Sequence, residues 1–224
     1  LTGGIYLFIT LVTYILYVGY NDHSFLIITF LFSLLILGIF SDLKTNFSPK
    51  LRLLLQSVLV VFFIFLLELK INKTGLFFLD YFIDNSIFNI FFTSICVIIL
   101  INGSNFCDGV NCNVIGYYLI ITLAIHFIDL PKSLNFPDIK TIIIIFFVFY
   151  LVNLLQKSFL GDNGVYVIAT FMAIYVINFI NLNTEVSPIL ALNLLWYPAF
   201  ENLFTILRRL NSNKTIDAAD GLHL

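Results

Sequence analysis

Eight apolar stretches of 15 to 20 residues, separated by short polar segments, run along the whole chain. They cover residues 4–20, 24–40, 53–69, 87–101, 114–128, 139–155, 165–180 and 188–207. The stretches are apolar at almost every position, whereas the strands of a membrane barrel alternate between apolar and polar residues. A helix that crosses a bilayer needs about 17–25 apolar residues. The pattern therefore predicts an all-α, polytopic membrane protein with about eight transmembrane helices, organised as one domain over residues 1–224.

Composition excludes the other broad classes of protein. Hydrophobic residues make up 60% of the chain and charged residues 11%, against about 25% charged in soluble domains. Such a chain lacks the polar residues that would cover the surface of a soluble globule. Its 26 Phe and 11 Tyr exclude disorder, because they would collapse in water. The net charge of −2 gives no basic surface for nucleic acid.

The polar segments divide between the two sides of the membrane if every stretch crosses once. One side holds segments 41–52, 102–113, 156–164 and 208–224. The other side holds segments 21–23, 70–86, 129–138 and 181–187. Seven of the 11 Lys and Arg fall on the first side and four on the second. The positive-inside rule places the first side in the cytoplasm, and we expect its four segments to form one catalytic cleft there.

Two aspartates of the cytoplasmic segments allow a plain and a chemical interpretation. Asp162 belongs to a Gly-Asp-Asn-Gly sequence, which is typical of a turn. Alternatively, it is a carboxylate held at a helix end for a hard cation, beside glycines that let a phosphate approach the backbone. Asp42 opens a segment with Lys44, Lys50 and Arg52, which is either a topology signal or a binding site for phosphate.

Four further oxygen-bearing side chains follow one another at a spacing of three residues. They are Asn102, Asn105, Asp108 and Asn111. At a helix end this spacing places them along one face. Amide and carboxylate oxygens on one stripe suit Mg²⁺ and its waters, although a solvated helix end would have the same composition.

The last cytoplasmic segment adds basic residues and a histidine. Arg208 and Arg209 have the same two interpretations as the earlier basic segment, and His223 follows an Asp-Gly-Leu sequence. Glu201 lies two turns before Arg208, within an apolar stretch. An acidic residue inside a span is costly and indicates a functional site, unless it lies near the interface.

Taken in order, these segments resemble the polyprenyl-phosphate N-acetylhexosamine-1-phosphate transferases. TGGI (2–5) resembles the Gly-Gly-Ile segment of that family. GIFSDLKTNFSPKLRLLLQ (38–56) resembles its Asp-Asp loop and the Ser-Pro-Lys-x-Arg-Leu-Leu sequence that follows. INGSNFCDGVN (101–111) resembles its asparagine-rich Asp-Gly motif, and LGDNG (160–164) its Gly-Asp-Ser-Gly motif. DGLHL (220–224) resembles the start of its His-x-His loop.

The resemblance implies a membrane glycosyltransferase of cell-envelope synthesis, for example of lipopolysaccharide or O-antigen. Such an enzyme transfers a sugar-1-phosphate from a UDP-N-acetylhexosamine to undecaprenyl phosphate and releases UMP. The resemblance also implies a place in the bacterial inner membrane, an active site facing the cytoplasm, and Mg²⁺ (or Mn²⁺ in its place) as cofactor. It leaves open whether the protein is a homodimer.

Roles for individual residues follow from the same resemblance. The catalytic residues would be Asp42, Asp108 and Asp162, and Asp162 and Asp108 would also hold the metal. The substrate-binding residues would be Asn102, Asn105, Asn111, Lys44, Arg208, Arg209 and His223.

The chain departs from the family pattern at several positions. Ser41 stands where the family has the first Asp of its pair, and Asn163 where it has Ser. The Asp-Gly motif ends in Cys112 and Asn113 and lacks its second Gly. A second loop histidine would lie beyond Leu224, so the chain resembles a member truncated at both ends. The alternatives to an active transferase are a membrane transporter and a catalytically inactive truncated relative.

Overall fold

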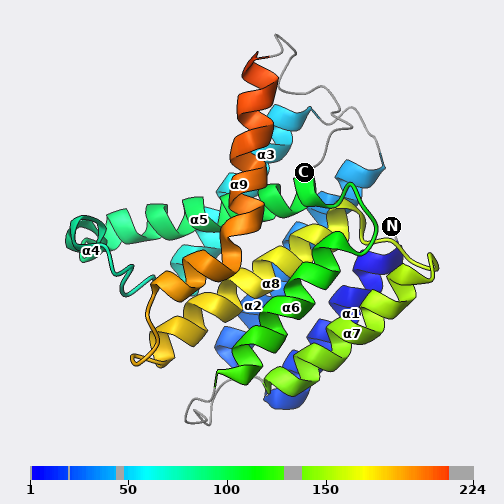
Figure 1. Cartoon of the computed structure of the whole chain (residues 1–224), viewed down its shortest axis with the longest axis horizontal. Coiled ribbons are helices and arrows are strands. Elements are labelled where there is room, and N and C mark those ends of the chain that lie inside the picture. The colour runs from blue at the N-terminus through cyan, green and yellow to red at the C-terminus, as the bar shows by residue number, and fades with distance from the viewer. Residues whose placement is uncertain (1, 20, 44–47, 129–137, 212–224) are drawn as a thin grey trace.

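The structure, a computed structural model, describes residues 2–19, 21–43, 48–128 and 138–211 and is helical throughout these ranges, without a strand (Figure 1). The helices in the described ranges are α1 (Thr2–Val18), α2 (Asp22–Asp42), α3 (Pro49–Leu66), α4 (Phe77–Ile83), α5 (Ser86–Cys107), α6 (Asn113–Phe127), α7 (Ile139–Leu154), α8 (Gly161–Leu182) and α9 (Ile189–Asn211).

The structure confirms the prediction of an all-α, polytopic membrane protein. Every apolar stretch of the sequence forms one helix, and the short α4 lies in the polar segment between the third and fourth stretches. By length and composition, α2, α3, α5, α8 and most of α9 can cross a membrane. The remaining apolar helices are shorter, with 17 residues in α1, 15 in α6 and 16 in α7.

Polar residues fix where several helices begin. Asn21 caps α2 by accepting a hydrogen bond from the Ser24 N–H at 2.7 Å. Ser48 caps α3 in the same way, and Pro49 occupies the first helical position, where its missing N–H costs nothing. This cap starts α3 four residues before the apolar stretch that predicted it, so its first turn carries polar side chains.

Helix α8 forms the centre of the bundle. It packs against α1, α2, α5, α6 and α9, and every residue from 163 to 176 is buried. A helix that is apolar on all sides is stable only when it is surrounded in this way. Figure 1 shows α8 crossing the middle of the molecule between these neighbours.

Two glycines let α1 and α2 approach the first turn of α8 closely. A Cβ atom on Gly38 of α2 would lie 2.3 Å from the Cα of Asn163. A Cβ atom on Gly4 of α1 would lie 2.4 Å from the backbone nitrogen of Gly164. These positions therefore have no room for a side chain, and backbone packing fixes the depth at which α8 begins.

Helix α9 bends and packs against the second half of α5. Pro198 lies inside α9, where it removes one backbone hydrogen bond and kinks the helix. Figure 1 shows the two halves of α9 running in different directions. The carbonyl of Pro198 lies against Gly103 of α5, in the space that a Cβ atom there would need.

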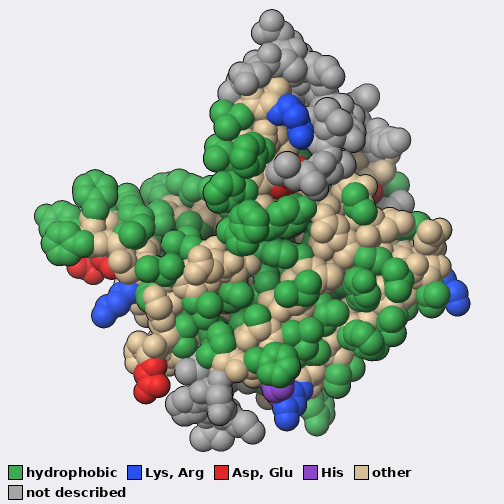
Figure 2. All heavy atoms as spheres, viewed as in Figure 1, with side chains coloured by type: hydrophobic (Ala, Val, Ile, Leu, Met, Phe, Trp, Pro, Cys, Tyr) green, Lys and Arg blue, Asp and Glu red, His purple; other side chains and the backbone are tan. Residues whose placement is uncertain are grey.

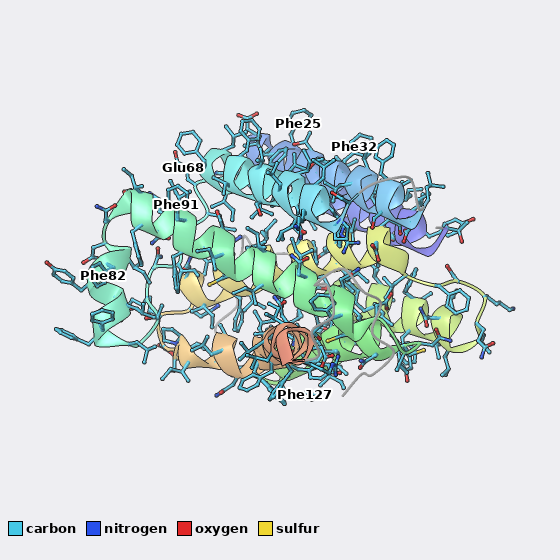
Figure 3. All side chains as sticks on the ribbon, turned by 90° about the horizontal axis from the view of Figure 1, so that it is seen from above. Phe25, Phe32, Glu68, Phe82, Phe91 and Phe127 are labelled. Carbon is cyan, nitrogen blue, oxygen red and sulfur yellow. The ribbon has the colours of Figure 1, made fainter. Side chains whose placement is uncertain are left out.

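Apolar side chains cover the outer surface of the bundle (Figure 2). Figure 3 shows Phe25, Phe32, Phe82, Phe91 and Phe127 at its periphery, with exposed fractions between 39% and 81%. An exposed apolar surface of this extent indicates a protein–membrane contact. The outer face is therefore the lipid-facing face of the protein.

Candidate active site

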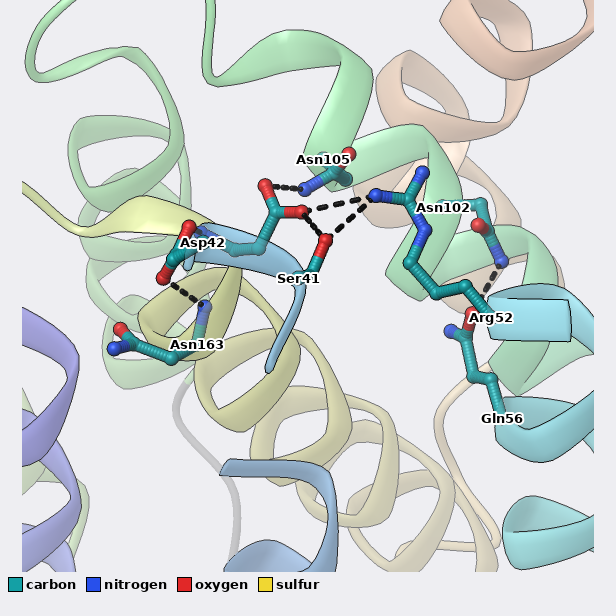
Figure 4. A network of polar contacts seen from close by, with 8 residues as sticks. Ser41, Asp42, Arg52, Gln56, Asn102, Asn105 and Asn163 are labelled. Atoms are coloured by element: carbon teal, nitrogen blue, oxygen red, sulfur yellow. Dashed lines mark hydrogen bonds and ion pairs between the residues drawn. The ribbon is translucent and has the colours of Figure 1, made fainter. Parts of the chain in front are cut away.

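A charged polar network lies at one side of the bundle, where α2 and α5 end and α3 and α8 begin (Figure 4). Its centre is the carboxylate of Asp162, in the first turn of α8. Asp162 Oδ1 accepts a hydrogen bond from Asn105 Nδ2 at 2.7 Å. Asp162 Oδ2 accepts hydrogen bonds from the Ser41 hydroxyl and from Arg52 Nη1, the latter at 3.0 Å. Helices α2, α3, α5 and α8 thus meet at this carboxylate, as the sequence led us to expect for three of the four cytoplasmic segments.

Arg52 is the cation of the network. Its Nη1 atom lies 3.0 Å from Asp162 Oδ2, and the two side chains are 25% and 27% exposed. The same nitrogen donates to the Ser41 hydroxyl at 2.8 Å. An ionised donor and an ionised acceptor form a stronger hydrogen bond than neutral groups do. Because both side chains remain partly exposed, an anionic ligand can reach the guanidinium.

Ser41 explains how the chain tolerates its departure from the family pattern. The hydroxyl donates to Asp162 and accepts from Arg52. An aspartate at this position would bring a further negative charge to Asp162 and could not donate a hydrogen bond when ionised. Serine thus keeps the connection between α2 and α8 with less charge.

Asp42 caps the N-terminus of α8 from the end of α2. Its Oδ1 accepts a hydrogen bond from the Asp162 N–H at 2.9 Å, and its Oδ2 accepts one from the Asn163 N–H at 3.3 Å. Leu160, the residue before α8, provides no side-chain cap. A negative charge also interacts favourably with the positive end of the helix dipole. Asp42 therefore positions Asp162.

The turn before α8 requires a glycine. Gly161 has a φ angle of +63° and its Cα faces the Asp42 carboxylate. Residues with a side chain rarely adopt this backbone conformation. The Gly-Asp-Asn-Gly sequence is therefore both a turn and the start of a helix that presents a carboxylate, so the two interpretations offered by the sequence are compatible.

Asp108 is the third carboxylate of the site and follows the last residue of α5. Burial raises the pKa of its carboxyl to about 7, and the negative charges of Asp162 and Asp42 add to the rise. Burial is the larger cause of this rise. Three carboxylates beside the one guanidinium of Arg52 leave the site with a net negative charge when all are ionised. A site with surplus negative charge favours a cation or a second basic group.

The donor set fits Mg²⁺ in combination with substrate, although it is not a complete protein cage. No group of three His, Cys, Asp or Glu that could hold a metal occurs in the described part of the chain. Mg²⁺, however, commonly binds one or two carboxylates, substrate phosphates and several waters. An ionised carboxylate has about four acceptor positions, of which Asp162 uses three. Asp162 and Asp108 could therefore supply carboxylate oxygens to a cation whose other ligands are phosphate oxygens and waters.

The asparagines predicted for the site lie in different surroundings. Asn105 contacts Asp162 directly. Asn102 instead donates to Gln56 Oε1 of α3 at 3.2 Å, one turn deeper in the bundle. The expected stripe of four residues is wrong for Asn111, because α5 ends at Cys107 and Asn111 lies in an exposed turn.

The predicted basic residues are only partly described. Arg208 lies in α9 and is partly buried. The backbone of Arg209 also belongs to α9, but its side chain lies outside what the structure describes, as do Lys44 and His223. Glu201 is 1% exposed and accepts a hydrogen bond from Thr205 of its own helix at 3.5 Å. Its carboxylate is therefore buried inside the bundle and does not face the membrane interface.

Sequence reasoning predicted Asn105 for the site but missed the other two side chains that contact Asp162. Ser41 was noted only as a departure from the family pattern, and Arg52 only as part of a basic segment. The signal that could have identified Arg52 is its position one turn after the Ser-Pro start of α3, which points it back toward the same membrane face. Which acid it would meet, 110 residues away, depends on the packing of α3 against α5 and of α2 against α8.

Comparison with known families agrees with this geometry. The model of the family described as "Glycosyl transferase family 4" matches residues 24–180, which is more than half of the 224-residue chain. The match includes Asp42, Arg52, Asn105, Asp108 and Asp162. No curated protein and no solved structure matches the chain. Because the family match covers more than half of the chain and nearly all of the helices that form the site, the chain belongs to glycosyl transferase family 4.

Proposed function

We propose that the protein transfers an N-acetylhexosamine-1-phosphate from its UDP-sugar to undecaprenyl phosphate and releases UMP. Membership of the family implies the coarser reaction, phospho-sugar transfer to a polyprenyl phosphate. In the proposal, the reaction takes place at the cytoplasmic face of a bacterial inner membrane, as a step in the synthesis of a cell-envelope glycan such as lipopolysaccharide.

The observation that carries the proposal is the convergence of Asp42, Asp162, Asn105 and Arg52 at one end of the bundle (Figure 4). Phosphoryl transfer requires the positioning of two phosphates and the neutralisation of charge, with little covalent help from the protein. The site offers a cation, fixed carboxylates and amide donors at the membrane surface. A lipid phosphate can reach this surface while its tail remains in the bilayer.

The reaction needs no protein nucleophile. An oxygen of the lipid phosphate attacks the phosphorus atom that carries the sugar. The bond between this phosphorus and the oxygen bridging it to the uridylate breaks, and UMP leaves with that oxygen. The product is a lipid diphosphate-sugar. Because a phosphate monoester is largely ionised near neutral pH, the attack does not require a general base.

Each residue of the site would have its own role in the reaction. Arg52 would bind phosphate oxygens and balance the negative charge that develops on them. Asp42 would hold the first turn of α8 and thereby Asp162. Asn105 would keep the Asp162 carboxylate in place and could donate to the nucleotide. When bound, Mg²⁺ would be held by Asp162 and Asp108 and would neutralise the phosphates of the donor.

An apolar groove suits the tail of the proposed acceptor. It has a volume of about 670 Å³ and lies between α3 and α5, and its walls are almost entirely apolar. Its first residue on α3 is Ser57, next to Gln56, which bonds to Asn102 of α5. On α3 the groove begins about 8 Å along the helix from Arg52, at 1.5 Å per residue. On α5 its wall lies in the first turns of the helix, at the end away from Asn105. An isoprenoid chain that leaves the groove at its α3 end would place its phosphate toward Arg52.

The test is an assay of UMP release by the full-length protein in vesicles that contain undecaprenyl phosphate. A panel of UDP-sugars is supplied, and the lipid product is identified by mass spectrometry. We expect release with one or more UDP-N-acetylhexosamines, dependence on undecaprenyl phosphate, and loss of activity in EDTA that Mg²⁺ restores. Binding of the lipid without UMP release from any UDP-sugar would contradict the proposal and favour an inactive relative.

A further inference from the structure

A second groove lies on the other flank of the bundle, between α1 and α7. It has a volume of about 440 Å³, and Figure 1 shows the two helices side by side. Its deep part is mainly apolar, apart from Thr10, whose hydroxyl donates to the Leu7 carbonyl of its own helix. This part is open to the lipid: Ile144 and Val148 on its edge are 61% and 53% exposed, while Phe149 behind them is 8% exposed. From Val152 to Ile144 it extends about 12 Å along α7, at 1.5 Å per residue.

Polar groups gather at one end of this groove. Thr2 begins α1, and Lys157 and Ser158 follow α7. These three residues lie on the same membrane face as the carboxylate site, because Ser158 lies in the short connection that leads from α7 into the first turn of α8, where Asp162 is. The groove thus has a cationic, hydroxyl-bearing end at the membrane surface and an apolar end within the bilayer.

Ser158 gives an independent indication that this end binds a ligand. Its side chain is 7% exposed, and its Oγ atom has no hydrogen-bond partner in the described part of the chain. Buried hydroxyls are nearly always hydrogen-bonded. An acceptor oxygen placed between Ser158 and the exposed Lys157 would satisfy the hydroxyl and pair with the ammonium group.

The groove is separate from the carboxylate site. Gly4 of α1 packs directly against Asn163 and Gly164, so the first turn of α8 stands between the two sites. The lining of the groove contains no Asp or Glu. It can therefore hold a phosphate without repulsion, but it offers no group that would take part in phosphoryl transfer.

We infer that this groove binds an anionic phospholipid from the leaflet on the same side as the carboxylate site. The phosphate contacts Lys157 and the Ser158 hydroxyl, and one acyl chain lies along Val148 and Ile144. Charge complementarity at one end and apolar walls at the other match the two parts of such a lipid. The inference does not depend on the proposed transferase reaction.

Native mass spectrometry of the full-length protein in detergent tests the inference. Phosphatidylglycerol and phosphatidylcholine with identical acyl chains are the two probes. We expect the anionic lipid to bind about fivefold more tightly, which is the effect of one lysine near a lipid phosphate. The variant Lys157→Gln should remove this preference and Ser158→Ala should reduce it. Val148→Trp, which fills the groove, should weaken the binding of both lipids.

The matched control is Lys50→Gln, which removes an exposed positive charge from the same membrane face, away from the groove. It should retain the preference for phosphatidylglycerol. Thermal unfolding in the same detergent checks that each variant is folded. Equal binding of phosphatidylglycerol by the wild type, Lys157→Gln and Val148→Trp would overturn the inference. The inference would also be overturned if neither lipid binds and the protein forms a dimer that Val148→Trp dissociates. In that case a second copy of the chain would occupy the groove.

Discussion

The two ends of α8 are both joined to neighbouring segments by polar side chains, but the chemistry of the two contacts differs. At the C-terminal end, Asn181 Oδ1 accepts from the Asn72 N–H at 3.2 Å, and Asn181 Nδ2 donates to the Lys70 carbonyl at 2.6 Å. At the N-terminal end, the Asp162 carboxylate meets Arg52, Ser41 and Asn105.

The two contacts differ in the charge that they hold. The amide of Asn181 pairs with one backbone donor and one backbone acceptor, so no charge is left over. The N-terminal end holds the carboxylates of Asp42, Asp108 and Asp162 beside the Arg52 guanidinium, and the pKa of Asp108 is raised by burial and then by the charges of Asp162 and Asp42. Proteins avoid such a surplus of negative charge unless another ligand balances it.

Adding one methyl group at Gly38 should disrupt the packing of α2 against the N-terminal end of α8. The new Cβ atom would lie 2.3 Å from the Cα of Asn163, and backbone atoms cannot move aside as a flexible side chain can. We expect Gly38→Ala to destabilise the protein by about 3 kcal/mol or more and to abolish transfer. Thermal unfolding in detergent measures the first effect and UMP release the second.

Gly116→Ala is the control for this experiment. Gly116 is also helical, but its nearest neighbour would be a Tyr150 ring atom at 3.2 Å, which can shift. Alanine also favours a helix by about 1 kcal/mol over glycine, so this variant should be as stable as the wild type. Equal stability of the two variants would show that α2 does not pack on α8 as described.

Removing the charge of Arg52 should weaken catalysis while the fold remains. We expect Arg52→Gln to lower UMP release about 100-fold, since loss of one well-placed donor to a developing negative charge has effects of this size. Arg52→Lys should retain more activity because it keeps the charge, although it lacks the planar fork of donors. Lys50→Gln, two residues earlier on α3, should behave as the wild type. Unchanged turnover in Arg52→Gln would remove Arg52 from the site.

Asn181→Ala should have the opposite profile to the site variants. It removes two hydrogen bonds to the backbone at residues 70 and 72, with an expected cost of about 1–3 kcal/mol. The melting temperature should fall, and UMP release below that temperature should stay within about threefold of the wild type, because no charge near the substrate changes. A large loss of turnover at full stability would contradict the division between the two ends.

The pH dependence of stability should report the raised pKa of Asp108. The pKa of Asp108 is about 7 in the folded protein and about 3.9 in an unfolded chain. Between these values the folded state binds more protons than the unfolded state, so stability falls as the pH rises. In EDTA, the melting temperature of the wild type should fall between about pH 4 and pH 7 relative to that of Asp108→Asn. A parallel pH dependence of the two proteins would show that the Asp108 carboxyl is not buried beside the other carboxylates as described.

The sequence was sufficient to predict the helices and which of their ends share a side. Continuous apolar stretches specify helices in a bilayer, and alternation of sides then places Asp42, Asp108 and Asp162 on one face. The structure adds which side chains touch. The pairing of Arg52 with Asp162 depends on the rotation of two helices about their axes, and an apolar stretch leaves that rotation undetermined.

The roles of the small residues could not be predicted either. Gly4 and Gly38 lie in apolar stretches, where glycine carries no pattern of its own, and their importance comes from the neighbour that each one meets. The prediction that Asn111 joins a stripe failed for a local reason. The helix ends at Cys107, and Cys112 then adopts a left-handed φ of 67° before α6 begins, so the spacing of three loses its meaning.

The most direct test of the central claim is the Mg²⁺ dependence of UMP release by the wild type, Asp162→Asn and Asp108→Asn, with Asn181→Ala as the opposite-end control. We predict that Asp162→Asn lowers turnover at least about 100-fold. Asp108→Asn should raise the Mg²⁺ concentration required, while Asn181→Ala should follow the wild-type curve. Near-wild-type turnover and Mg²⁺ dependence in both aspartate variants would contradict the assignment of the metal and of the active site.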